Sequence, residues 1–211
     1  MPRVRVPGGP SLLLRPWAYE DVDALVRHHR DPLMRRWLAT RLDGEEDARA
    51  WVAEQHRGRR AGSRVAFAVV EEDAAGPGEP VGHVAFTAAA GAARVGYWTA
   101  PAARGRGIAS LALALATAWA AGAADSPFTG RRFELVHALD NEASCRTALA
   151  GGFPTEHTLA ADPPARPRPM HLHLWAGAGP DPAPYGWRAE AATGRAGTVP
   201  LGDASAGPRG T

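Results

Sequence analysis

The chain has 211 residues, 45% of them hydrophobic, which is enough for one sizeable core and an appendage but short for two domains. All 24 basic residues are arginines scattered among 22 acidic residues, so the formal net charge is only +2 and nucleic-acid binding has little support. Apolar runs fall short of the ~18 residues of a membrane span, the N-terminus has no secretory pattern, and the single cysteine, Cys145, cannot form an internal disulfide. We therefore expect a cytoplasmic protein with neither a membrane nor a nucleic-acid partner.

The N-terminal half predicts two helices and four strands. Residues 11–15 form a strand pattern, and apolar residues at helical spacing predict a first helix over 22–29. A second helical pattern over 48–55 follows an acidic start, which suits the positive end of a helix dipole. Gly76-Pro77-Gly78 is typical of a hairpin connection. The remaining strands of this half are predicted at 64–70, 81–87 and 94–99.

The C-terminal half predicts a buried helix from Ile108 and a strand over 133–139. Asp140 or Asn141 can cap a short helix that ends at Gly151-Gly152. Two closing strands are predicted at 153–159 and 170–175. Residues 177–211 contain little but Ala, Gly, Pro, Thr and charges, so we expect one domain over 1–176 and a mostly disordered tail over 177–211.

The segment Arg104-Gly105-Arg106-Gly107-Ile108-Ala109 is a glycine-rich turn that opens into the helix from Ile108. Such a turn offers unpaired N–H groups and the positive end of the dipole to a diphosphate, although a helix-entry loop without a ligand has the same pattern. A nucleotide P-loop needs a lysine, and the chain has none. A dinucleotide-binding fold needs an acidic residue about 20 residues after the turn, and Asp125 is at that distance. It also needs a third glycine and a turn early in a βαβ unit, whereas this turn lies in the middle of the chain.

Several separate blocks resemble the GNAT superfamily of N-acetyltransferases, and most closely its RimJ/RimL-like branch. The resemblance covers about residues 11–176, and its blocks are Tyr97-Trp98-Thr99, Pro101, Arg104 to Ala109, Asn141 to Arg146 and Gly152-Phe153. It implies an α/β (α+β) fold with a splayed, mostly antiparallel mixed sheet flanked by helices. It also implies acetyl transfer from acetyl-CoA to an amine.

The resemblance further implies where the coenzyme binds. Its pyrophosphate would bind to backbone amides of Arg104, Gly105, Arg106, Gly107, Ile108 and Ala109. The pantetheine arm would pair with the main chain of Trp98 and Thr99, where this strand splays from the next, much as a peptide adds to a strand edge. Asn141 and Ser144 would lie beside the arm and the thiol.

The resemblance predicts the catalytic residues less directly than it predicts the coenzyme site. Many relatives place a tyrosine acid where this chain has Ala148, which leaves Ser144 to assist the departing thiolate; a helical serine can instead bond a carbonyl one turn back. Where relatives have a glutamate, this chain has Arg94-Val95, so His83 is the substitute general base, unless it is an ordinary surface histidine. An α-amine, with a pKa of about 7.7 to 8.0, needs little help with deprotonation.

His171 and His173 would share one face of a strand, which allows a zinc site. The sequence shows no cysteine pair and no obvious third ligand, so we expect structural roles for both and no metal. The acceptor is expected to be a primary amine, such as a protein N-terminal α-amine. Acetylation of a small amine or antibiotic remains an alternative, as does an acyl-CoA-binding regulator that has lost transfer. The sequence leaves a homodimer open.

Overall fold

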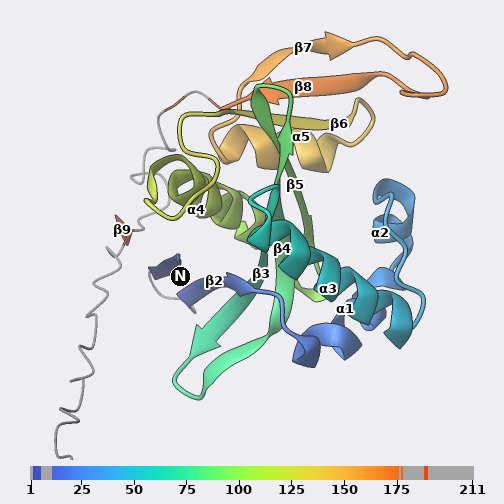
Figure 1. Cartoon of the computed structure of the whole chain (residues 1–211). Helices are drawn as coiled ribbons and strands as arrows, with labels where there is room; N and C mark the ends of the chain where they lie inside the picture. Colours follow the sequence, from blue (N-terminus) through green and yellow to red (C-terminus); the bar gives the residue numbers. More distant parts are fainter. Residues whose placement is uncertain (1, 6–10, 176, 178–187, 190–211) are drawn as a thin grey trace, which may run out of the picture.

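A computed structural model describes residues 2–5, 11–175, 177 and 188–189. Its strands are β1 (Arg3–Arg5), β2 (Ser11–Pro16), β3 (Arg64–Asp73), β4 (Gly76–Ala89), β5 (Ala92–Thr99), β6 (Arg132–Ala138), β7 (Thr155–Leu159), β8 (Met170–Leu174) and β9 (Arg188–Ala189). They form one sheet in the order β7-β8-β6-β5-β4-β3-β2-β1-β9 (Figure 1). All neighbouring pairs are antiparallel except β5 and β6, which are parallel. The expected mixed, mostly antiparallel sheet is confirmed.

Helices cover both faces of the sheet (Figure 1). They are α1 (Val22–His29), α2 (Pro32–Trp37), α3 (Glu45–Arg60), α4 (Ile108–Gly122) and α5 (Glu142–Ala150), with 3-10 turns η1 (Tyr19–Asp21) and η2 (Pro101–Ala103). Residues of α1, α2 and α3 pack into one hydrophobic core, and residues of α4 and α5 pack into the other. No helix in the described ranges combines the length and apolar character needed to cross a bilayer.

Strand β3 shows how one apolar run serves two cores. Val65, Phe67 and Val69 lie in the core under α4 and α5, whereas Ala66 and its alternate neighbours lie in the core under α1 to α3. Successive side chains of a strand point to opposite faces, so a strand that is covered on both sides is apolar throughout. This burial explains why residues 64–70 lack the polar alternation of a half-exposed strand.

The sheet splays between β5 and β6. These strands pair only over Ala92–Val95 and Arg132–Leu135, although β5 continues to Thr99. On its other side β5 stays paired with β4 as far as the Gly82 and Thr99 register. The backbone of residues 96–99 is therefore a strand edge without a β6 partner, as the resemblance implied.

Two local features differ from the sequence prediction. Helix α2 was not predicted, and it forms because Asp31 caps it by accepting a 2.9 Å hydrogen bond from the Met34 N–H and Pro32 fills its first turn. Gly76-Pro77-Gly78 lies inside β4, and the connection is two residues earlier, at Ala74 and Ala75. The register of β3 and β4 shifts on either side of Val70, which lets these residues pair as a strand.

The predicted tail contains one described strand. Arg188–Ala189 forms β9, which pairs antiparallel with β1 at the edge of the sheet. A mostly disordered tail was predicted over 177–211, and within it the structure places these two residues in the sheet. The rest of the predicted tail after Gly177 lies outside the described residues.

Candidate active site

A cleft of about 480 Å³ opens where β5 separates from β6. Helix α2 forms one wall, and the end of β5, the turn before α4, the first turn of α4 and one face of α5 form the others. The predicted coenzyme residues that line it are Trp98, Thr99, Arg104, Gly105, Gly107, Ile108, Ala109, Asn141 and Ser144. Tertiary structure thus brings three separate segments of the prediction to one cavity.

The glycine-rich turn holds open space at the start of α4. Gly105 and Gly107 both have φ of +74°, in the left-handed region that glycine adopts without strain. A Cβ atom built at either glycine would meet nothing within 4 Å. Gly107 is the N-cap of α4, and the first N–H groups of an α-helix lack intrahelical acceptors. Free donors, a positive dipole end and empty space therefore coincide, as an anion site requires.

The two arginines of the turn are already paired with carboxylates. Arg104 Nη2 lies 2.5 Å from Asp31 Oδ1, which connects the turn to the N-terminus of α2. The Arg104 hydrogen bond is the main cause that lowers the pKa of Asp31. Arg106 forms an ion pair with Glu71 of β3. Because both guanidinium groups have protein partners, the backbone amides are the donors left for a diphosphate.

Ser144 lies in the first turn of α5, where Asn141 is the N-cap. The Asn141 side chain accepts a 3.1 Å hydrogen bond from the Ser144 N–H. Tyr97 of β5 donates its hydroxyl to the Ser144 carbonyl oxygen at 2.9 Å, and its oxygen also lies 2.7 Å from Ser144 Oγ. The Ser144 hydroxyl therefore contacts Tyr97 rather than a carbonyl one turn back.

Tyr97 is a site residue that the sequence reasoning missed. It lines the cleft, and burial raises its pKa to about 12, so the phenol keeps its proton at neutral pH. Strand alternation was the available signal: Tyr97 packs with the core under α4 and α5, whereas the neighbouring Trp98 packs with the other core. A residue next to Trp98 in β5 must face α5.

His83 occupies a position that suits neither sequence interpretation. It is buried at 6% exposure, so it is not a surface histidine, and it does not line the cleft. Its Nδ1 accepts a 3.0 Å hydrogen bond from Trp17 Nε1, and its ring stacks on Trp98. Burial lowers its pKa to about 3. A group that stays neutral and is enclosed by tryptophans is not placed to take a proton from an amine, so the prediction of His83 as the base has no structural support.

His171 and His173 do share one face of β8, as expected, but they are not alone. His137 of β6 and Cys145 of α5 lie beside them, and one donor atom from each of the four residues lies within 4.8 Å of the others. The expectation of no metal was based on the lack of a third ligand. That premise is wrong, because the structure supplies two further donors.

The chain is similar to known proteins in sequence profile and in fold. The sequence profile described as Acetyltransferase (GNAT) domain matches residues 11–154, whereas no curated protein sequence matches.

Solved structures of three acetyltransferases align with the chain. RimL, a ribosomal L7/L12 alpha-N-protein acetyltransferase solved with coenzyme A, aligns with 22% sequence identity and a TM-score of 0.65, and the alignment covers 82% of this chain and 96% of RimL. Mycobacterium smegmatis RimJ, solved with a CoA-disulfide, has 23% identity, TM-score 0.62 and coverage of 82% and 84%. The microcin C7 self-immunity acetyltransferase MccE, solved with acetyl-CoA and AMP, has 16% identity, TM-score 0.65 and coverage of 77% and 91%.

These likenesses show a RimJ/RimL-like fold, and the profile covers most of the chain. The open turn at the start of α4 and the splayed edge of β5 lie within the matched residues. The chain therefore belongs to the GNAT family of acetyltransferases.

Proposed function

We propose that this protein transfers an acetyl group from acetyl-CoA to a primary amine, namely the N-terminal α-amine of a protein or peptide. One observation carries the proposal. A single cleft joins the open turn before α4, the unpaired edge of β5 and the Ser144 hydroxyl. In this order, the three features suit the pyrophosphate, the amide-rich pantetheine arm and the thioester of the coenzyme.

The coenzyme would bind with its pyrophosphate on the amides of residues 104–109. Its pantetheine amides would pair with the backbone of residues 96–99, which have no β6 partner. This direction leads the thioester toward the first turn of α5, where Ser144 lies. RimL and MccE were solved with coenzyme A and acetyl-CoA, which supports the same ligand class for this cleft.

The reaction needs few charged groups. The neutral amine nitrogen attacks the thioester carbonyl carbon, the C–S bond breaks, and the proton lost by the nitrogen goes to the sulfur. A backbone N–H near Trp98 or Thr99 would stabilise the oxyanion, and Ser144 would donate a hydrogen bond to the departing sulfur. A thiol has a pKa of about 8.5, well below the value of about 12 for Tyr97, so Tyr97 keeps its proton and orients Ser144.

The charge of the cleft favours an α-amine over a polycation. Among the described residues that line it, none is Asp or Glu, and Arg104 and Arg146 are basic. Polyamines and aminoglycosides carry several positive charges that carboxylates would have to balance, whereas about a quarter to two fifths of an α-amine with a pKa of about 7.7 to 8.0 is already neutral at pH 7.5. A buried carboxylate base is therefore not required. The likeness to RimL, which acts on a protein α-amine, supports the same class.

Thiol release from acetyl-CoA tests the proposal. Three acceptors should be compared: a lysine-free peptide with a free N-terminus, the same peptide with a blocked N-terminus, and spermidine. We expect release with the free peptide only. Release with spermidine but not with peptides would instead establish a small-amine acetyltransferase. Coenzyme binding without release from any acceptor would indicate a non-catalytic acyl-CoA-binding regulator.

A further inference from the structure

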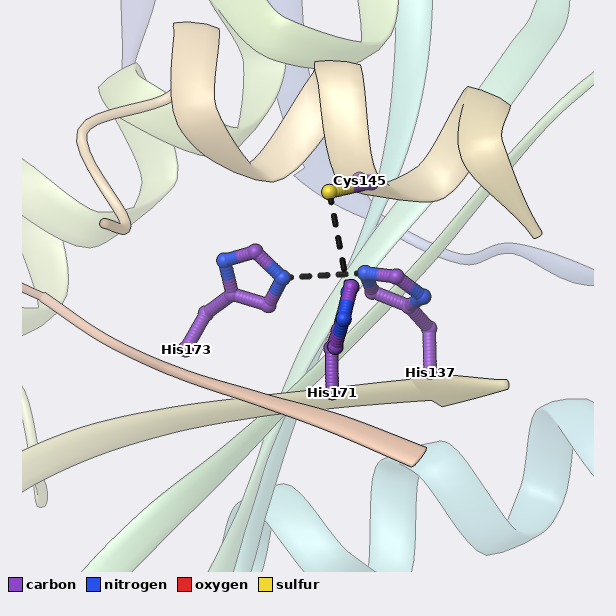
Figure 2. Close-up of side chains that lie close together, drawn as sticks. All are labelled: His137, Cys145, His171 and His173. Carbon is purple, nitrogen blue, oxygen red and sulfur yellow. Dashed lines mark hydrogen bonds between the residues drawn. The ribbon is translucent and has the colours of Figure 1, made fainter. Parts of the chain in front are cut away.

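A cluster of four metal-ligating side chains, which we name the His3Cys cluster, lies outside the cleft. It consists of His137, Cys145, His171 and His173. Figure 2 shows the four side chains pointing at a common centre, with Cys145 approaching from α5 and the histidines from the two strands below it. His137 and His171 are directly opposed across β6 and β8, and His173 lies two residues along the same face. The sequence separates these donors, and the sheet brings them together.

Backbone carbonyls fix the orientation of two of the imidazoles. His137 Nδ1 lies 2.8 Å from the Ala138 carbonyl oxygen, and His173 Nδ1 lies 2.9 Å from the Phe153 carbonyl oxygen. A carbonyl oxygen only accepts, so both Nδ1 atoms must carry the proton and both Nε2 atoms hold a lone pair. Thr155 Oγ1 is 3.4 Å from His173 Nδ1, a weaker contact that leaves this assignment unchanged. Hydrogen bonds of this kind orient histidine ligands in metal sites.

The two Nε2 lone pairs then face each other at 2.9 Å. Two neutral imidazoles in this arrangement repel, because neither has a proton to donate. One extra proton between them would also relieve the repulsion, but it would place a charge on two buried rings. A cation bound by both lone pairs relieves the repulsion without protonating a buried ring.

Cys145 and His171 complete a tetrahedral set. Cys145 Sγ lies 3.8 Å from His171 Nδ1. Cys145 is in the first turn of α5, so its sulfur approaches the histidines from the helix side of the cluster (Figure 2). Zinc bonds of about 2.0–2.1 Å to nitrogen and about 2.3 Å to sulfur place tetrahedral ligands roughly 3.3–3.6 Å apart. The donor atoms, all within 4.8 Å of one another, reach that spacing by side-chain shifts of about 1 Å.

We propose that the His3Cys cluster binds one structural Zn²⁺ ion. Four protein ligands fill the tetrahedron and leave no position for substrate, and none of the four lines the cleft. The ion would connect α5 to β6 and β8, next to the point where β5 and β6 separate. Because Cys145 follows Ser144, the site would hold the start of α5 in place while taking no part in acetyl transfer.

Metal analysis tests this site without reference to acetylation. The chain, purified with any affinity tag removed, should contain about one zinc per molecule, and chelation should lower its melting temperature. Restoring one equivalent of Zn²⁺ should restore the melting temperature, because a ligand that binds only the folded state stabilises it. Co²⁺ added to the stripped protein should titrate at one equivalent, giving the visible bands of tetrahedral cobalt and a near-ultraviolet thiolate-to-cobalt band.

Variants identify the ligands. Cys145→Ser should abolish the thiolate-to-cobalt band and weaken metal affinity about tenfold or more, and His171→Ala should weaken it comparably. His157→Ala, at an exposed histidine of β7 outside the cluster, is the matched control and should bind metal as the wild type does.

The proposal is overturned if the wild type binds less than about one metal ion per molecule, or if the cobalt spectrum lacks the thiolate band. The cluster would then be a hydrogen-bonded histidine core. Equal loss in His157→Ala and Cys145→Ser would also overturn it, because binding would then be a surface effect.

Discussion

Ser144 and Tyr97 form a hydroxyl pair across the cleft, and their contacts define what each can do. Tyr97 is held by the Ser144 carbonyl oxygen as well as by its hydroxyl, so the phenol is fixed with respect to α5. Its raised pKa, about 12, makes it a donor of hydrogen bonds and a poor source of protons. Ser144 is therefore the group able to turn toward a departing sulfur, with Tyr97 as its positioning partner.

Replacement of Ser144 by alanine separates a catalytic from a structural hydroxyl. If the hydroxyl stabilises the leaving thiolate, Ser144→Ala should lower kcat about 10-fold to 1000-fold with little change in coenzyme affinity. The variant loses one hydrogen bond, about 1 kcal/mol of unfolding free energy, while the carbonyl contact to Tyr97 remains. Thiol release at saturating acetyl-CoA, measured beside thermal melting, checks both values. Normal turnover in the folded variant would leave catalysis to positioning and a backbone oxyanion donor.

The buried His83 predicts how stability depends on pH. Its folded pKa, about 3, lies below the ordinary value of 6.5, so the unfolded chain binds more protons below pH 6.5. The stabilisation is thus fully present above pH 6.5 and is lost as the pH falls toward 3, by at most about 1.4 kcal/mol per pH unit. His83→Gln keeps an acceptor for Trp17 but cannot titrate, so its stability should decline less steeply. Urea unfolding between pH 7.5 and 4.5 measures this, with exposed His157→Gln as control; parallel wild-type and His83→Gln curves would contradict it.

At the scale of elements, the turn before α4 is held from two sides. Arg104 bonds Asp31, the cap of α2, and Arg106 bonds Glu71 of β3. Helix α2 and the sheet are thereby fixed around the open space at Gly105 and Gly107. This arrangement leaves space at the two glycines, and we therefore expect the arginines to position the turn while its amides bind the diphosphate.

Coenzyme binding at this turn can be tested at Gly107. Acetyl-CoA should raise the melting temperature of the wild type, and Gly107→Glu should abolish that rise because a carboxylate would occupy the diphosphate site. Gly107→Ala controls for backbone strain, since both substitutions place a side chain at a φ of +74° at a cost of about 1–2 kcal/mol. The alanine variant should keep a weaker but measurable rise. An unchanged rise in Gly107→Glu would remove the turn from the site.

At the scale of the whole molecule, the sheet separates its C-terminal edge strand from the cleft. Strand β9 pairs with β1 at the edge of the sheet opposite β7, and four strands lie between β9 and β5. Helices α4 and α5, which form part of the cleft wall, belong to the core on one face of the sheet, and α2, which forms another part, belongs to the core on the other face.

Deletion of residues 178–211 should consequently leave the coenzyme site intact. The deletion removes the short pairing of β9 with β1, which we expect to reduce the unfolding free energy by no more than about 2 kcal/mol. The rise in melting temperature with acetyl-CoA should match that of the full chain. Calorimetry of the two proteins, with and without coenzyme, makes the comparison. Loss of soluble protein on deletion would show that this segment is needed for folding.

Local sequence patterns predict seven strands, the starts of α1, α3, α4 and α5, and the glycine-rich turn, because caps, periodicity and left-handed glycines depend on neighbouring residues. The side-chain contacts of the site, by contrast, arise only in the folded chain. Tyr97 and Ser144 are 47 residues apart, and Trp17 and His83 are 66 apart. The histidines His137 and His173 are separated by 36 residues. Such pairs form because strands and helices pack in one arrangement, and burial then sets their pKa values, which local spacing cannot encode.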